Sequence, residues 1–104
     1  MEVKQFRLES KTSTVFAAGK VIHTTQREFD LAFLLFRHVD LLLSRNQIME
    51  AVWGRRAIDA NSRTIDTHIS RLRLKLDLRP ETGFVLGTVY NHGYRLEQVE
   101  PLTA

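Results

Sequence analysis

The segment from Asn61 to Leu78 constrains the fold more than any other part of the chain, because its apolar residues recur at helical spacing. Four aliphatic residues in it are separated by four, three and four positions: Ile65, Ile69, Leu72 and Leu76. At about 100° of rotation per residue they fall within about 60° of one another, which makes a narrow stripe. The spacing predicts a helix over 61–78 with one buried face. Either Asn61 or Ser62 is a suitable N-cap, and Pro80 and Gly83 are expected to end the helix.

The side of this helix that faces away from the apolar stripe is polar and basic. Its members are Arg63, Thr67, Ser70, Arg71 and Leu74. From Arg63 to Arg79, five basic and two acidic residues give a local charge of +3, equal to the formal net charge of the whole chain. Basic charge concentrated on one element is typical of phosphate binding. An ordinary solvated helix face explains the charge equally well.

The segments before this helix change from strand-like to helical patterns. Residues 1–24 contain short β-prone stretches at 6–9, 14–17 and 20–24, which predict a small antiparallel sheet. Two sequences that suit capping boxes then begin helices: Thr25-Gln26-Arg27-Glu28 and Ser44-Arg45-Asn46-Gln47. The first helix is expected over Gln26–His38 and the second from Ser44 to Trp53-Gly54. Their expected inward residues are Phe29, Ala32, Phe33 and Phe36, and then Ile48, Ala51 and Val52.

After the third helix, two β-prone stretches flank a turn. Phe84-Val85-Leu86 and Tyr94-Arg95-Leu96 lie on either side of Asn91-His92-Gly93, which predicts a β-hairpin over 84–97. With 104 residues the chain is the size of one domain. The expected fold class is therefore α+β, a winged helix-turn-helix over 1–104. It has an N-terminal sheet (1–24), a three-helix core (25–79) and a hairpin wing (84–97).

Five motifs in this order and spacing resemble a known family. They are Thr25-x-x-Glu28-Phe29, Leu43-Ser44-Arg45, Val52-Trp53-Gly54, the string from Arg63 to Leu76, and Gly93-Tyr94-Arg95-Leu96. Together they resemble the OmpR/PhoB-type DNA-binding domain, the output domain of bacterial two-component response regulators. The resemblance implies sequence-specific binding of double-stranded DNA for transcription regulation, with the third helix in the major groove.

Three residues on the outward face suit contacts with base edges. Arginine can donate two hydrogen bonds to guanine O6 and N7, so we expect Arg71 to contact a base. Thr67 and Ser70 are short enough to reach base edges or a thymine methyl group.

Position at the edges of this face, together with the resemblance, assigns phosphate contacts to a second set of residues. The set comprises Trp53, Arg63, Thr64, His68, Arg73, Thr88 and Tyr94. Two members have an alternative: Trp53 equally suits a core position that closes the second helix, and His68 suits a half-buried position at the border of the stripe. Asp66 is expected to be structural and to pair with Arg63.

The predicted wing departs from the family pattern. Members commonly carry Thr-Val-Arg-Gly-x-Gly-Tyr, whose arginine enters the minor groove, whereas this chain has Tyr90 at that position, followed by Asn91 and His92. Whether the wing enters the minor groove, with Asn91 or His92 in place of the arginine, is left open. Leu74 stands where a basic residue is usual, and it either packs against the wing or meets a thymine methyl group.

The resemblance also implies protein partners. The loop from Gly54 to Ala60 corresponds to one that touches RNA polymerase in this family, with Arg55, Arg56 and Asp59 as polar candidates, although a merely solvated loop is an equal alternative. Binding as a head-to-tail dimer on direct repeats in promoters is expected. A receiver domain does not fit in 104 residues. The chain is therefore either an excised output domain or a DNA-binding domain attached to another kind of sensor.

Several function classes have no support in the sequence. There is no cysteine, the four histidines have no metal-ligand spacing, and no nucleophile motif or carboxylate pair is present. We therefore expect no catalytic residue, metal, cofactor or small-molecule substrate. No apolar run is long enough for a membrane helix, and the resemblance implies a bacterial cytoplasmic protein. The remaining alternative, a winged-helix module that binds protein, predicts a third helix without exposed arginines.

Overall fold

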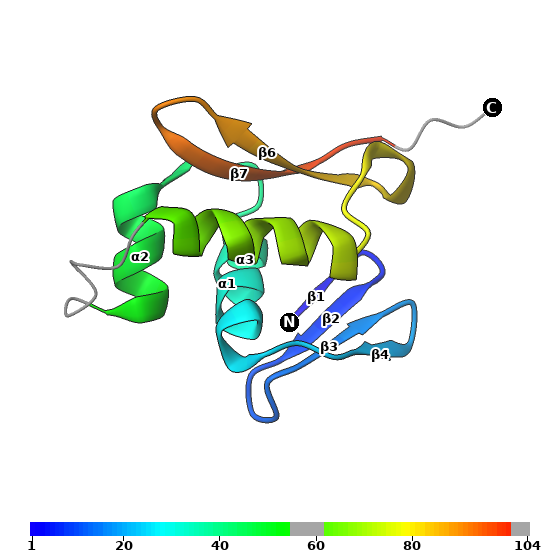
Figure 1. Cartoon of the computed structure of the whole chain (residues 1–104). Helices are drawn as coiled ribbons and strands as arrows, with labels where there is room; N and C mark the ends of the chain where they lie inside the picture. The colour runs from blue at the N-terminus through cyan, green and yellow to red at the C-terminus, as the bar shows by residue number, and fades with distance from the viewer. Residues whose placement is uncertain (55–61, 101–104) are drawn as a thin grey trace.

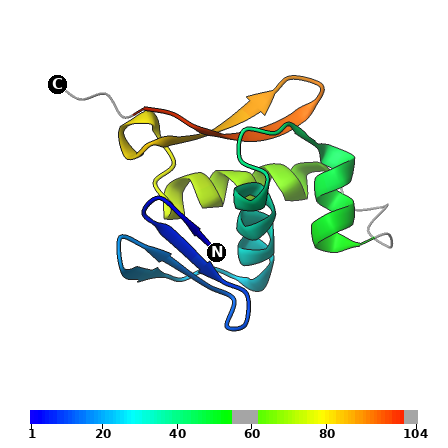
Figure 2. The same ribbon diagram turned by 180° about the vertical axis from the view of Figure 1, so that it is seen from behind.

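Three helices separate an N-terminal sheet from a C-terminal hairpin in this computed structural model, which describes residues 1–54 and 62–100 (Figure 1). The same layering is visible from behind, where the third helix passes behind the first (Figure 2). The expected α+β winged helix-turn-helix is confirmed.

The N-terminal sheet has four antiparallel strands in the order of the sequence. They are β1 (Glu2–Val3), β2 (Phe6–Glu9), β3 (Thr14–Ala17) and β4 (Lys20–Ile22). The alternation that predicted the sheet reflects burial of one of its faces. Phe6 and Leu8 of β2 and Val15 of β3 point into the core and are at most 1% exposed. The short β1 was not predicted, because two residues are too few for a periodic pattern.

Capping boxes begin the first two helices, as predicted. The helices span Gln26–Arg37 (α1) and Arg45–Trp53 (α2). The Thr25 hydroxyl accepts a hydrogen bond from the Glu28 amide at 3.2 Å, and the Glu28 carboxylate accepts one from the Thr25 amide at 2.8 Å. Ser44 and Gln47 make the same reciprocal pair at 3.1 and 2.8 Å.

Three details of these helices differ from expectation. α1 ends at Arg37, one residue early, with His38 as its C-cap. Ala51 is exposed rather than inward, and Phe33 is only half-buried, where it packs against Phe29 at a ring distance of 5.8 Å. Leu35, which was not among the expected inward residues, is buried instead, with 2% exposure.

The third helix, α3 (Ser62–Lys75), is shorter than the expected 61–78. It ends because Asp77 adopts a left-handed conformation with φ of 52°, and the Leu78 amide then donates back to the Arg73 carbonyl at 3.0 Å. Leu78 leaves the helix yet stays 9% exposed in the core. Pro80 does not end α3; it begins a separate short 3-10 helix, η2 (Pro80–Thr82).

The C-terminal sheet is wider than a hairpin. Its strands are β5 (Leu43–Ser44), β6 (Phe84–Val89) and β7 (Gly93–Gln98), in the order β5-β7-β6. β6 and β7 confirm the predicted hairpin, while β5 was missed. Its pairing requires Gly93: a Cβ there would lie 2.0 Å from the Leu43 carbonyl oxygen, and its φ is 145°.

Aromatic packing joins the three layers. The rings of Phe6 on β2, Phe36 on α1 and Phe84 on β6 have centroid distances of 5.1, 5.5 and 5.5 Å. The N-terminal sheet, the helices and the wing therefore share one core, and this core fixes the position of α3 relative to the hairpin.

Candidate nucleic-acid interface

The two faces of α3 divide as the sequence predicted. The apolar stripe is buried, with Ile65, Ile69, Leu72 and Leu76 at 0 to 2% exposure. The opposite residues are all exposed: Arg63, Thr67, Ser70, Arg71 and Leu74. The helix lies on the surface of the core along its length, between the hairpin and the N-terminal sheet (Figure 1). It therefore presents one continuous row of side chains to solvent.

The three predicted base-reading residues lie together on this row. Thr67 donates its hydroxyl proton to the Arg63 carbonyl at 2.9 Å, so its oxygen still has lone pairs with which to accept a hydrogen bond. Ser70 is exposed one turn further along. The side chain of Arg71 is exposed and makes no hydrogen bond or ion pair with another described residue, which leaves its guanidinium donors available.

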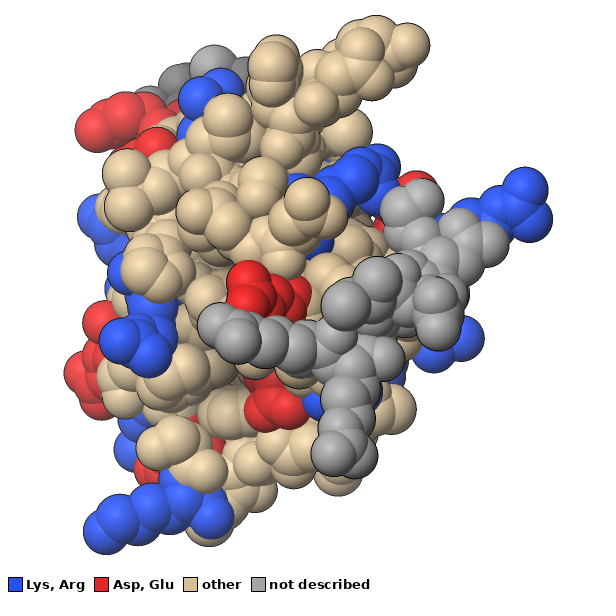
Figure 3. Space-filling view, turned by 90° about the vertical axis from the view of Figure 1, so that its left-hand side faces the viewer, with Lys and Arg blue, Asp and Glu red and all other residues tan. Residues whose placement is uncertain are grey.

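Much of the basic charge in this part of the chain is used internally. Lys75 binds Glu28 at 2.6 Å, and Arg79 binds Asp77 at 2.7 Å. At the end of the molecule that carries α2 and the tip of the hairpin, acidic side chains are likewise interspersed among Lys and Arg (Figure 3). The local charge of +3 therefore overstates the number of cations that are available to bind phosphate.

Arg73 joins α3 to the hairpin. Its Nε donates to the Leu86 carbonyl at 2.8 Å, and its Nη2 donates to the Thr88 hydroxyl at 3.1 Å. Arg73 and Thr88 were both predicted to bind phosphate. Arg73 is half-buried and Thr88 is exposed. These two bonds leave other guanidinium N–H groups of Arg73 and the hydroxyl proton of Thr88 unused. A phosphate contact stays a prediction for those remaining donors.

A three-residue cluster joins α2, α3 and β7. Arg45 binds the Asp66 carboxylate at 2.9 Å and donates to the Tyr94 hydroxyl at 3.3 Å, and this hydroxyl also donates to Asp66. The guanidinium of Arg45 lies 5.2 Å from the Tyr94 ring centroid. The hydrogen bond from Tyr94 and the ion pair with Arg45 lower the pKa of Asp66, which is ionised at neutral pH.

This cluster corrects two expectations. Tyr94 is 3% exposed and its hydroxyl is bound to Asp66, so the predicted phosphate contact is not available to it. Burial and that hydrogen bond both raise the pKa of Tyr94. Asp66 is structural, as expected, but the partners that position it are Arg45 and Tyr94 rather than the predicted Arg63.

Glu28 holds the other end of α3. Its side chain is 1% exposed, and its Oε1 accepts hydrogen bonds from the Thr25 amide at 2.8 Å and from Lys75 at 2.6 Å. Burial alone would raise the pKa of Glu28, but these two hydrogen bonds outweigh burial and lower it. One residue thus caps α1 and anchors the last turn of α3.

Trp53 and His68 pack against each other at the junction of α2 and α3. Their rings meet edge to face with centroids 5.1 Å apart, and both side chains are half-buried. His68 Nδ1 lies 2.7 Å from the Thr64 carbonyl oxygen. A carbonyl only accepts, so Nδ1 carries a proton and Nε2 faces away from this bond. The half-buried alternative for His68 is confirmed, and Trp53 also packs against the core.

The tip of the hairpin exposes its predicted residues. Tyr90, Asn91 and His92 form the loop between β6 and β7 and are all exposed, Tyr90 by 83%. The His92 amide donates to the Val89 carbonyl at 2.9 Å, and Asn91 has a φ of 62°. Asparagine tolerates this conformation better than most residues, which accounts for its place in the turn. The polymerase-facing candidates Arg55, Arg56 and Asp59 lie outside the described residues.

Arg45 is the functional residue that reasoning from the residues themselves missed. It lies 21 positions before Asp66 and 49 before Tyr94, so no local pattern connects the three. Only its place in the Leu43-Ser44-Arg45 motif indicated that it mattered. Its basic side chain at the start of α2 is otherwise indistinguishable from a solvated one.

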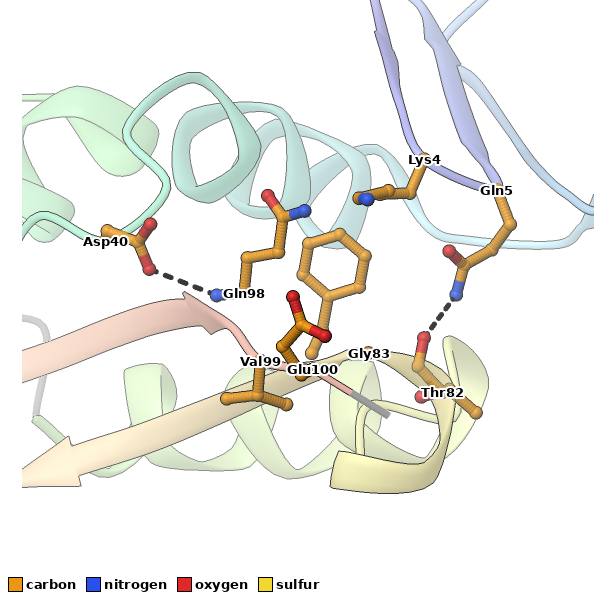
Figure 4. Close-up of a pocket in the computed structure, with 9 residues that line it drawn as sticks. Lys4, Gln5, Asp40, Thr82, Gly83, Gln98, Val99 and Glu100 are labelled. Atoms are coloured by element: carbon orange, nitrogen blue, oxygen red, sulfur yellow. Dashed lines mark hydrogen bonds between the residues drawn. The ribbon is translucent and has the colours of Figure 1, made fainter. Parts of the chain in front are cut away.

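A surface cavity of about 350 Å³ lies elsewhere, between the β1–β2 turn, the turn after α1, η2 and the end of β7 (Figure 4). No residue of α3 lines it. Gln5 donates to the Thr82 carbonyl at 2.8 Å across it, and Asp40 accepts from the Gln98 amide at 3.0 Å. These polar groups are occupied by one another.

Residues 1–54 and 62–100 hold neither a metal-ion site nor a membrane-spanning helix. No group of three or more His, Asp or Glu side chains lies close enough to hold a metal ion in this part of the chain. Nor does any helix there have the length and apolar character needed to cross a membrane.

An exposed polar helix on a three-helix core, beside a hairpin that shares the core, defines a winged helix-turn-helix DNA-binding domain. The sequence profile of the family described as "Transcriptional regulatory protein, C terminal" matches residues 19–96. The chain therefore belongs to this family, the OmpR/PhoB-type DNA-binding domains.

Individual relatives agree with this assignment. The sensory transduction protein RegX3 of Mycobacterium tuberculosis (strain ATCC 25618 / H37Rv) is 33% identical over 97 residues, which cover 93% of this chain and 42% of the relative. The chain thus spans less than half the length of RegX3 and of other curated relatives that it matches.

Solved structures show the same fold. The DNA-binding domain of CpxR from E. coli has a TM-score of 0.79 and 30% identity, and the match covers 94% of this chain and 95% of that domain. The DNA-binding domain of the response regulator AdeR, solved in complex with an intercistronic region, has a TM-score of 0.76 and 26% identity. That match covers 93% of this chain and 97% of the AdeR chain.

Proposed function

We propose that this chain binds double-stranded DNA sequence-specifically, with α3 in the major groove. The observation that carries the proposal is the exposed row on α3 in which Arg71 has no partner among the described residues. B-DNA's major groove accepts one α-helix, and arginine recognises guanine there with two hydrogen bonds. Thr67 and Ser70 contact neighbouring base edges.

The ends of α3 are held in a way that supports this use. Asp66 is bound to Arg45 and Tyr94 near one end, and Lys75 is bound to Glu28 at the other. Precise base contacts need a helix whose position is fixed before DNA binds, because each ordered side chain otherwise costs conformational entropy.

Phosphate contacts are assigned to residues around this row. The assigned residues are Trp53, Arg63, Thr64, His68, Arg73 and Thr88. Arg73 and Thr88 contribute the donors that their mutual bond leaves over, so they also fix the distance between helix and wing. The wing loop, with Tyr90, Asn91 and His92, approaches the adjacent minor groove, where its lack of arginine predicts weaker insertion than is usual in the family.

At the level of the whole protein, the domain acts as the effector part of a two-component response regulator in the bacterial cytoplasm. The relatives support this, since AdeR is a response regulator and RegX3 a sensory transduction protein. The domain regulates transcription without enzymatic activity. Two copies bind head to tail on direct repeats about one helical turn apart. RNA polymerase is a further proposed partner.

Selection of binding sites from random duplex DNA tests the function. We expect a defined half-site and an affinity that falls as salt rises, because cations on the protein displace counterions from the phosphates. Arg71→Ala should weaken binding to the selected site, whereas Lys20→Ala removes one charge from the exposed strand β4 and should leave it unchanged. Recovery of no enriched sequence would refute specific binding.

A further inference from the structure

Leu74 is the most conspicuous apolar side chain on the DNA-facing row. It is 83% exposed, although it lies on a 14-residue helix that buries four aliphatic residues on its other face. At about 100° per residue it lies almost opposite the centre of the buried stripe, in the middle of the outward face. Single exposed leucines are common, so exposure alone would carry no meaning. The position is what distinguishes this one.

Packing within the domain does not account for Leu74. The alternative that it packs against the wing is wrong, because the wing contact of this turn is made by its neighbour Arg73 and Leu74 remains 83% exposed. Leu74 is also absent from the residues that pack against the core. Its apolar surface is therefore available to an external partner that lies along α3.

The geometry of the row identifies what that partner offers. Leu74 is three residues after Arg71 and four after Ser70, which places it about 4.5 to 6 Å further along the helix axis. Successive base pairs are about 3.4 Å apart. A helix lying in the groove therefore brings Leu74 to a base pair one or two steps from the one that Arg71 contacts.

We propose that Leu74 determines specificity by packing against the C5-methyl group of a thymine in the major groove. This methyl group is the apolar feature among the base edges there, and leucine has no hydrogen-bond donor or acceptor with which to recognise the others. Leu74 thus selects an A·T base pair beside the pair read by Arg71. The inference rests on the proposed function, since it requires α3 to enter the major groove.

Replacement of single thymines by deoxyuridine tests the proposal directly. The exchange removes the methyl group and leaves the hydrogen-bonding edge unchanged. Fluorescein-labelled duplexes with one selected half-site are titrated with the full chain, and binding is followed by anisotropy. At one thymine we expect about fourfold weaker binding, the change that corresponds to one buried methyl-sized group.

The variant Leu74→Ala assigns that methyl group to its partner. We expect it to bind the thymine and deoxyuridine duplexes equally at that position, and to keep any other sensitivity. Alanine favours helix, and the side chain is exposed, so an unchanged melting temperature should show that the variant folds like the wild type. Lys20→Ala serves as the control that retains the sensitivity.

Three results would overturn the proposal while leaving DNA binding intact. In the first, no single deoxyuridine weakens binding to the half-site. In the second, the sensitivity persists in Leu74→Ala, which would assign the methyl group to another residue. A loss that appears only with two adjacent half-sites would instead place Leu74 between two copies of the chain, and it too would refute methyl recognition. If no half-site can be selected at all, the proposed function itself fails.

Discussion

Replacement of Lys75 by methionine should expose how strongly α3 depends on its buried anchor. The change keeps an unbranched side chain of similar length but removes the cation bound to Glu28 at 2.6 Å. The Glu28 carboxylate would then remain 1% exposed with one oxygen, Oε2, already without a hydrogen-bond partner. Loss of one partner from a buried ion pair costs about 3–5 kcal/mol. Because Lys75 is itself 36% exposed, solvent screening reduces the expectation to about 2 kcal/mol.

The pH dependence of this loss provides the sharper test. In the wild type the pKa of Glu28 is lowered, so its contribution to stability is present above the unfolded pKa and disappears as pH falls through the folded pKa. In Lys75→Met, the hydrogen bond and the charge of Lys75 that lower this pKa are lost while burial remains, so the pKa of Glu28 should rise relative to the wild type. The ionised carboxylate of the variant then contributes less stability than that of the wild type. The difference in stability between wild type and variant should therefore be larger at pH 7 than near pH 4.

Urea denaturation followed by circular dichroism at both pH values measures the two differences. At pH 7, about 2 kcal/mol corresponds to a melting temperature roughly 8–15 °C lower for a domain of this size. Lys20→Met is the matched control, since Lys20 is exposed on β4, and it should change stability by less than about 0.5 kcal/mol. An equal loss at pH 7 and pH 4 would show that Lys75 acts through packing of its methylene chain, and would refute the electrostatic argument.

Three further predictions concern the reading row, the wing and the sheet. Arg71→Ala should cost about 1–3 kcal/mol on the selected site and little on random duplex DNA; equal losses on both would make Arg71 a phosphate ligand. Arg73→Ala removes the bonds to Leu86 and Thr88, so amide hydrogen exchange in β6 should accelerate along with weaker binding to all sequences. Unchanged exchange would mean that the hairpin is held by the core alone. Gly93→Ala should prevent folding or lower the melting temperature by more than 15 °C, because its Cβ would lie 2.0 Å from the Leu43 carbonyl oxygen; a melting temperature near that of the wild type would show that β5 detaches freely.

Local patterns predicted most of this fold. The buried stripe of α3 and both capping boxes follow from residues within one or two helical turns of each other, and all of them are confirmed. The errors also have local causes. α3 ends where Asp77 adopts a left-handed conformation. Aspartate also occurs inside helices, so its presence alone does not predict a helix end. Pro80 is a stronger signal, but it lies three residues later. The two-residue strands β1 and β5 are too short to show alternation.

The candidate site was predicted less completely, because its supporting contacts join distant segments. The exposed reading row could be derived from helical spacing alone. By contrast, Asp66 binds Arg45 at the start of α2 and Tyr94 on β7, and Lys75 binds Glu28 near the start of α1. Periodicity cannot reveal long-range pairs like these, and they changed the partner expected for Asp66 and the role expected for Tyr94.

These long-range pairs alter what the basic stretch can do. Arg73, Lys75 and Arg79 each bind a group within the chain, so most of the charge that first indicated phosphate binding serves to fix α3, the hairpin and the turn after α3. Fewer released counterions mean a shallower dependence of affinity on salt than the sequence charge predicts. A larger share of the affinity must then come from contacts that carry sequence information, namely the donors of Arg71 and the apolar surface of Leu74. On this reasoning the domain gains specificity because its basic residues are engaged elsewhere, and a steep salt dependence would contradict it.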